Sequence, residues 1–350
     1  MQATSQQHHK VPGIVLEILR VVVPISVSVL LVVWLFHKVN FAQVREIMSH
    51  GVDYRYLVLM MIIIVMSHII RGIRWGIQLR GVGIPRIPVV AESVSIFGDY
   101  SLNLILPFLG EAWRCLYIAK RQNCKLATVV GTDIGDRASD GIMISIIIVF
   151  TFFVAKDAIM KFLDHYKFGE ELLKYCSDGK VWLGLLALIA VIALLYWLLR
   201  KTKFVQGINL SIKRMWTGFA VLFHMKQTGL YIVLTVLIWV CYFFETYVCF
   251  FAFPFTRELI QSQPMFALVP GLVVFVFGSI SMIVPSNAGL GPWNIAVIFA
   301  LSLYGISETD GAAYSVLVWS FQAFALIAEG VFSVFYIMWE RRHLQRANAA

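Results

Sequence analysis

The sequence predicts an all-α, polytopic membrane protein. Of its 350 residues, 59% are hydrophobic and only 14% are charged, a balance that ordinary soluble domains do not reach. The run VWLGLLALIAVIALLYWLL, residues 181–199, has about the length that one helical crossing of a bilayer needs. Similar runs recur along the chain and leave no stretch for a soluble domain. The other predicted spans are 14–36, 56–79, 126–155, 229–255 and 313–339.

The net charge of +9 lies in short connecting segments rather than along a continuous basic face. Such a distribution follows the positive-inside rule and does not favour nucleic acid as a partner. The five cysteines are scattered without CxxC spacing, which supports neither a disulfide framework nor a metal site. We therefore expect no metal and no cofactor. His68, inside an apolar run, is interpreted as a helix-contact residue rather than a ligand.

Charges in the connecting segments predict the topology. Segment 200–226 carries six basic and no acidic residues, whereas segment 156–180 carries five of each, so we place the first inside and the second outside. Basic groups at 71–86 and 114–125 and the C-terminal tail also belong inside. The first apolar run lacks a small-residue cleavage site, which favours a retained helix over a signal peptide. Both termini are expected in the cytoplasm, in the plasma membrane of a prokaryote.

Two segments are predicted to enter the membrane and return on the same side. Both flanks of 87–113 are basic, and by the same counting both ends of 265–303 lie outside. In each, a polar residue stands four positions before a proline and a glycine follows. These residues are Asn103, Pro107 and Gly110 in the first segment, and Ser281, Pro285 and Gly289 in the second.

The chain therefore reads as about six transmembrane helices plus two re-entrant helical hairpins. Two halves of opposite orientation, 14–155 and 181–339, would be joined by the external loop 156–180 in one membrane domain. This is the inverted-repeat plan of many transporters.

The stretch NLILPFLGEAWR, residues 103–114, contains the first break. Non-helical backbone at membrane depth is tolerated only where protein buries it or where it lines a wet cavity. We expect Pro107 to end the first half-helix and Gly110 to permit the reversal. Glu111 and Arg114 would then lie at the mouth of a cavity. The alternative is an ordinary span that Pro107 and Gly110 merely kink.

A second charged constellation is TDIGDRASDG, residues 132–141. At helical spacing Arg137 can pair with Asp133, while Asp136 and Asp140 share one stripe. Each charge inside a span costs about 3 kcal/mol on the gentlest scale, so these groups should face one another or water. They could anchor the helix at the cytoplasmic interface, or form a lipid-headgroup or ion site together with the first break.

Isolated acids occur in two later spans. Glu245 and Glu329 could, like Glu111, be proton-coupling groups, or could simply be protonated and hydrogen-bonded between helices. Trp293 and Asn294 follow the sequence GLGP, which includes Gly291, and could contact substrate. The chain has no GxxxxGK[ST], HExxH or GxSxG motif, so ATP hydrolysis and the standard protease and hydrolase arrangements lack support.

At these residues the sequence resembles the lysylphosphatidylglycerol synthase transmembrane-region family, a flippase-like domain found alone or fused to an aminoacyl-lipid synthase. The resemblance runs from about residue 15 to 340 and is carried by NLILPFLGEAWR, DRASD and PSNAGLGPWN. The family often has an acidic residue before the arginine of the second motif, and in this chain that residue is Asp136. After the glycine-rich turn, Asn294 stands where the family often has a glutamate. Without the fused synthase domain, the resemblance implies lipid translocation and not aminoacyl transfer.

The leading hypothesis is a lipid transporter that moves a phospholipid or a polyprenyl-phosphate-linked lipid between leaflets. Arg114 and Arg137 would bind the phosphate, and Glu111, Asp136 and Asp140 would position them or bind a proton. The expected partners are membrane lipids and a separate lipid-modifying enzyme. The expected substrate-binding residues are Asn103, Pro107, Gly110, Glu111, Arg114, Asp136, Arg137, Asp140, Pro285, Gly289, Gly291 and Asn294.

Two alternatives stay open. One is an integral-membrane transferase acting on a lipid-linked sugar or phosphate, with Asp136 and Asp140 holding a divalent cation. The arginine between them would oppose this, because it would neutralise one carboxylate. The other is a non-transporting scaffold for a lipid-modifying enzyme.

Overall fold

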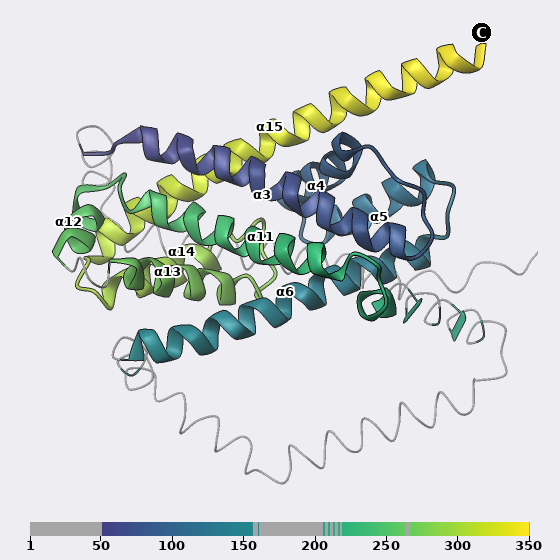
Figure 1. Ribbon diagram of the computed structural model, residues 1–350. Coiled ribbons are helices and arrows are strands. Elements are labelled where there is room, and N and C mark those ends of the chain that lie inside the picture. Colours follow the sequence, from purple (N-terminus) through teal and green to yellow (C-terminus); the bar gives the residue numbers. More distant parts are fainter. Residues whose placement is uncertain are drawn as a thin grey trace, which may run out of the picture. The chain divides into compact units, whose positions relative to one another are not determined.

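Helices make up the regular structure of the described part of the chain. The computed structural model describes residues 51–156, 160, 219–262 and 267–349 and a few residues between 206 and 217. Four of its helices are long and apolar enough to cross a membrane (Figure 1). They are helices where four spans were predicted, whereas the predicted spans 14–36 and 181–199 lie outside the described residues. The four are α3 (Tyr54–Gly81), α6 (Leu126–Val154), α11 (Thr228–Cys249) and α15 (Glu308–Ala349).

Shorter helices lie between these spans. α4 (Val89–Asn103) and α5 (Leu109–Arg121) fall in the first predicted hairpin, and α13 (Leu268–Ser281) and α14 (Pro292–Ser302) in the second. A 3-10 turn (Val221–Phe223) precedes α11, and α12 (Pro254–Ser262) follows it. The helix of the predicted span 229–255, α11, thus ends at Cys249 and not at 255, because Pro254 begins a new helix.

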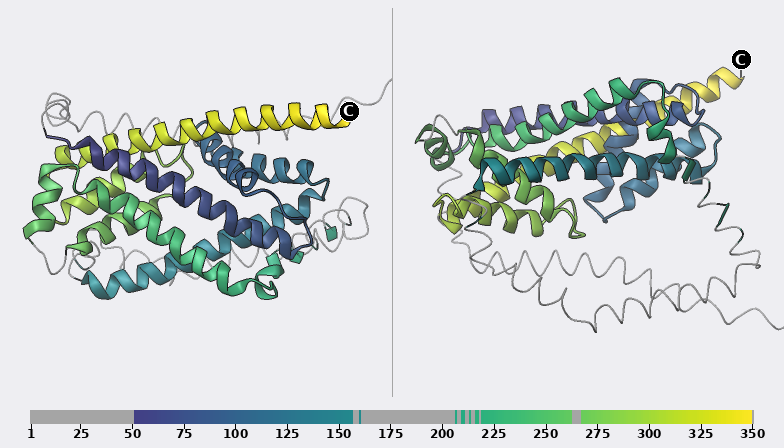
Figure 2. Two further views of the ribbon diagram at one scale, coloured as in Figure 1. Left: turned by 45° about the horizontal axis from the view of Figure 1, so that its top comes forward. Right: turned by 60° about the horizontal axis from the view of Figure 1, so that its bottom comes forward.

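The described helices fall into two compact units. The first takes the described residues before 73, residues 88–114 and those from 237 onward, and the second takes 73–87 and the described residues of 115–236. In the first unit α4 packs against α15, α13 against α14, and α14 against α15 (Figures 1 and 2). Both helix breaks therefore belong to the first unit.

The start of α3 is set by a local cap. The Asp53 carboxylate accepts hydrogen bonds from the Arg55 backbone N–H at 3.2 Å and from the Arg55 guanidinium at 2.9 and 2.7 Å. These bonds lower the pKa of Asp53 to about 2. The Arg55 side chain is 88% exposed, so the pair fixes the helix start rather than adding much stability.

The first break lies between Asn103 and Leu109. The prediction that Pro107 ends the first half-helix is wrong, because α4 already ends at Asn103. The expected role of Gly110 is also corrected. The left-handed residue of the turn is Phe108, with φ 65°, whereas Gly110 has no positive φ and lies in the first turn of α5.

Gly110 is needed for space. A Cβ atom at this position would overlap the backbone oxygen of Asp99 and its carboxylate. The absence of a side chain lets the start of α5 approach the last turn of α4 directly.

Gly110→Ala is expected to destabilise the folded protein by about 2 kcal/mol or more, since backbone must shift to relieve the overlap. The measurement is the thermal unfolding midpoint in detergent. Gly141→Ala is the matched control, because that glycine also lies in a helix and a Cβ there meets nothing within 4 Å. The control should be neutral or gain up to about 1 kcal/mol of helix propensity. Equal midpoints for Gly110→Ala and the native chain would contradict the close approach.

The second break, between Ser281 and Pro292, uses glycine for its conformation. Gly289 and Gly291 have φ of 83° and 94°, values that glycine adopts at no steric cost. At this break glycines hold the left-handed conformation that Phe108 adopts at the first break.

The two breaks contact each other. The Ala288 N–H donates to the backbone oxygen of Asn103 at 3.1 Å, and Asn287 Nδ2 donates to the oxygen of Ile105 at 3.3 Å. From α15, Trp319 Nε1 donates to the oxygen of Ala288 at 3.0 Å. These bonds satisfy polar backbone that helices no longer pair, as an apolar environment requires.

Candidate functional site

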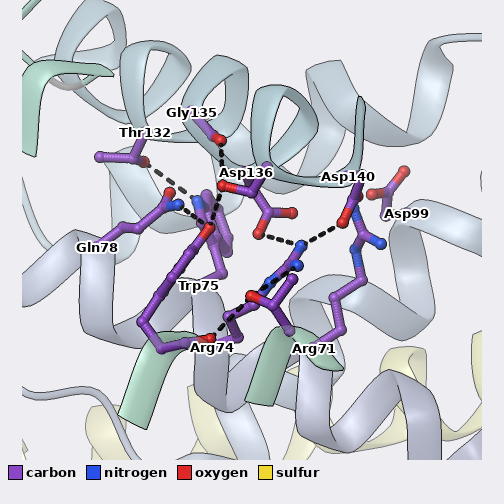
Figure 3. Close-up of polar contacts among 12 residues, drawn as sticks. Arg71, Arg74, Trp75, Gln78, Asp99, Thr132, Gly135, Asp136 and Asp140 are labelled. Carbon is purple, nitrogen blue, oxygen red and sulfur yellow. Dashed lines mark hydrogen bonds and ion pairs between the residues drawn. The ribbon is translucent and has the colours of Figure 1, made fainter. Parts of the chain in front are cut away.

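The second unit contains a buried arginine between two carboxylates. Arg74 of α3 points its Nη2 at Oδ1 of Asp136 (2.7 Å) and at Oδ1 of Asp140 (2.8 Å), both on α6 (Figure 3). The side chains of Arg74 and Asp136 have no exposed surface, and that of Asp140 is 16% exposed. Asp136 and Asp140 lie one helical turn apart, so one guanidinium reaches both.

Neutral hydrogen bonds surround this ion pair. Trp75 Nε1 donates to Thr132 Oγ1 at 3.1 Å. Gln78 Nε2 donates to the Tyr231 hydroxyl at 2.6 Å, and that hydroxyl donates to Ser139 Oγ at 2.8 Å (Figure 3). The bonds join α3, α6 and the start of α11, and they fix the rotamers around the charges.

Sequence reasoning missed Arg74 as the partner of the aspartates. We expected Arg137, paired with Asp133, to be the positive charge beside Asp136 and Asp140. Those two aspartates contact Arg74 instead, whereas Arg137 is exposed. Arg74 was counted among the basic residues that set topology. A better signal was its place inside a long helical run next to Trp75, where loop charges do not belong.

The arrangement offers little to a metal ion. Both aspartates direct an oxygen at the Arg74 guanidinium, which leaves them less available to a cation. Within the described ranges, no group of three or more His, Cys, Asp or Glu side chains is placed to hold a metal.

The first break holds a second buried charge pair. Arg114 Nε lies 3.3 Å from Oδ2 of Asp99, and their side chains are 0% and 1% exposed. Asn103 Nδ2 donates to the other Asp99 oxygen at 3.0 Å, and Asn103 Oδ1 accepts the Gly110 N–H at 2.9 Å. Asn103 therefore joins the end of α4 to the start of α5.

Glu111 is partly buried in the first turn of α5. The positive end of the helix dipole favours a carboxylate there. We expected Glu111 and Asp136 to contribute to one site. The structure places the two residues in different units.

At the second break, Asn294 has a role like that of Asn103. Its Oδ1 accepts the Gly291 N–H at 3.0 Å, and the residue is 1% exposed. Pro292 occupies the first position of α14, where a missing N–H costs nothing. The structure thus places Asn294, an expected substrate contact, as a helix cap.

Apolar side chains are exposed at both breaks. Ile105 and Phe108 are each 66% exposed and Ile283 is 79% exposed. Pro285 is exposed and Pro107 is partly buried. The breaks therefore combine a polar interior with an apolar surface.

The two isolated glutamates lie in the first unit. Glu329 is buried and contacts His68, and Glu245 contacts Ser67. His68, interpreted from the sequence as a helix contact, is thus also an ion-pair partner.

A family model described as the lysylphosphatidylglycerol synthase TM region matches residues 21–330. No curated protein and no solved structure gives a significant match to the chain.

Proposed function

Because the chain belongs to the lysylphosphatidylglycerol synthase TM region family, we propose that this integral membrane protein moves a lipid with a phosphate headgroup between leaflets. The observation that carries the proposal is the contact between the two helix breaks in the first unit. Paired discontinuous helices are the usual place of substrate binding in secondary transporters. Membrane lipids are the proposed partners, and the plasma membrane of a prokaryote with cytoplasmic termini is the proposed location.

Support for an inverted repeat comes from equivalent packing at the two breaks. A Cβ on Gly98 would overlap the Trp113 indole, and a Cβ on Gly278 would lie 2.7 Å from Nε1 of Trp293. Both glycines precede their tryptophan by 15 positions, and the pairs are 180 positions apart. In each case the second half-helix packs against a glycine of the first. We therefore propose that both breaks are re-entrant hairpins, one in each half of the chain.

The same order of helix lengths supports the repeat. A long apolar helix, two short helices and a second long apolar helix occur as α3, α4, α5 and α6, and again as α11, α13, α14 and α15. The first half-helices have 15 and 14 residues. α12 is an addition of the second half.

An amphipathic substrate suits the breaks. Asp99, Asn103 and Arg114 provide polar groups behind the first break, and Ile105 and Phe108 are exposed at its tip. A lipid presents a charged headgroup and apolar chains, which need both kinds of surface. Since Arg114 is fully buried, we propose that it positions the break. For the second unit by itself, we propose that the exposed Arg137 contacts a lipid phosphate by charge-assisted hydrogen bonds.

The test is translocation of fluorescent phosphatidylglycerol and a fluorescent polyprenyl phosphate in proteoliposomes. The native chain should move at least one lipid faster than empty vesicles. Arg137→Gln should lower the rate about tenfold or more, as expected for losing a hydrogen bond to a charged group. Arg55→Gln is the matched control, because Arg55 is exposed at the start of the first described span. No movement of any lipid by folded protein would overturn the proposal.

The proposed first hairpin predicts which side of the membrane its flanks face. Arg86→Cys and Lys120→Cys, both at exposed positions, should react with a membrane-impermeant thiol reagent from the same face. The measurement uses a cysteine-free background in sealed vesicles. Labelling from opposite faces would show that 87–113 is a full span, and the inverted repeat would then be wrong.

A further inference from the structure

A histidine and a glutamate form a buried pair in the middle of the first unit. His68 lies near the centre of α3, and its Nδ1 is 2.9 and 2.8 Å from the two carboxylate oxygens of Glu329 on α15. The side chains are 4% and 3% exposed. Ionisable groups inside membrane spans are costly and are typically kept for ion or proton pathways.

A second carboxylate reaches the adjacent residue of α3. Ser67 Oγ lies 2.7 Å from Oε1 of Glu245 on α11 and 2.8 Å from the backbone oxygen of Ile64. A hydroxyl carries one hydrogen, so both contacts are full hydrogen bonds only when a protonated Glu245 donates to Ser67. When Glu245 is ionised, Ser67 donates to it and the bond to Ile64 is lost. Ser67 can therefore hydrogen-bond to Glu245 in both protonation states of the carboxyl group, as acceptor in one and as donor in the other.

Further titratable groups face His68 from the helices around it. The Tyr100 ring of α4 stacks on the imidazole with centroids 4.0 Å apart. The Tyr100 hydroxyl lies 3.1 Å from the Tyr242 hydroxyl of α11, which accepts a hydrogen bond from Arg71 Nη1 at 3.0 Å. With Glu329 and Glu245, these groups come from four helices, so a charge change at His68 is felt by α3, α4, α11 and α15.

We propose that His68, Glu329 and Glu245 form a proton-binding site that couples lipid movement to proton movement. A proton on Nδ1 of the His68 imidazolium passes to a carboxylate oxygen of Glu329 and then leaves the pair, so that the net charge of the pair falls by one. A second proton binds to or leaves Glu245. Histidine is suited to this exchange because it titrates near neutral pH.

The site is connected to both helix breaks. Tyr100, which stacks on His68, lies three residues before Asn103 at the end of α4. Glu329 shares α15 with Trp319, which donates to Ala288 in the second break. Protonation can thus bias the contact between the breaks. Only the coupling rests on the proposed function, because proton binding is a property of these residues alone.

Proton binding is tested with the purified full chain by pH-titrated infrared difference spectroscopy. A carboxylic-acid carbonyl band should change with pH, and Glu329→Gln and Glu245→Gln should each reduce that change. Glu258→Gln, at an exposed position of α12, should leave the band unchanged. The double variant His68→Gln/Glu329→Gln removes both members of the pair, which preserves folding better than removing one. A titrating band that survives both Glu329→Gln and Glu245→Gln, or no such band, would overturn the site.

Coupling is tested in proteoliposomes with and without an imposed pH difference of two units. Each unit corresponds to a factor of ten per proton, so with one coupled proton the native chain should move fluorescent phosphatidylglycerol up to about a hundredfold faster with the favourable gradient. The double variant should show no gradient effect. If the native chain moves lipid at the same rate with and without the gradient, the coupling is wrong and the proposed function still stands. A titrating band without any lipid movement would overturn the proposed function and the coupling, and leave the proton site intact.

Discussion

Arg74→Met is expected to cost about 3–5 kcal/mol of the free energy of unfolding, which is the usual penalty for removing one partner of a buried ion pair. Asp136 has no exposed surface and directs an oxygen at Arg74 at 2.7 Å. Without the guanidinium, the Asp136 carboxylate must either stay charged in an apolar interior or take up a proton. The measurement is the unfolding midpoint in detergent, followed by intrinsic tryptophan fluorescence.

Arg137→Met is the matched control, since it removes the same charge one residue away from Asp136. Because Arg137 is exposed, its loss should change the free energy of unfolding by about 0.5 kcal/mol or less. The variant Arg74→Met/Asp136→Asn/Asp140→Asn, which removes the whole charge cluster, should recover much of the loss. A larger effect of Arg137→Met than of Arg74→Met would contradict the burial of Arg74 between the two aspartates.

The contrast between these arginines shows what helical spacing can predict. Spacing identified Asp136 and Asp140 as neighbours on one stripe of α6, and the structure confirms that they share a partner. The partner comes from α3, more than 60 positions earlier in the sequence. Spacing within one helix contains no information on which helix packs against it. The positive-inside rule led us to count Arg74 among the basic residues that predict which side of the membrane a segment faces. The rule uses the number of basic residues near a span and contains no information on their burial.

The helix breaks were predicted more completely than the charge clusters. Proline and glycine act locally, so both interruptions could be found from composition alone. The end of the first half-helix was missed by a few residues because Asn103, and not Pro107, is its last helical residue. For the first break, Asn103 sets this end through its bonds to Asp99 and Gly110.

Contacts between distant segments could not be predicted. His68 and Glu329 are 261 positions apart, and each stands alone in an apolar run. Their pairing depends on a contact between α3 and α15. The residues around His68 and those around Glu329 contain no local pattern that predicts this contact.

Cross-linking the two breaks is expected to stop lipid movement completely. In transporters built from repeats, one half moves against the other around the substrate site, and in this chain the breaks touch where the Ala288 N–H meets the Asn103 oxygen and Asn287 meets Ile105. In a cysteine-free background, Ile105→Cys/Asn287→Cys places two thiols across this contact. Oxidation to a disulfide should abolish translocation, and reduction of the disulfide should restore it. A short, cleavable bifunctional thiol reagent replaces oxidation if the two sulfurs do not meet the geometry of a disulfide.

Each single cysteine variant, treated in the same way, should keep the native rate. A linked protein that still moves lipid at the native rate would mean that the breaks stay together during transport, and the substrate path would then have to lie elsewhere in the protein.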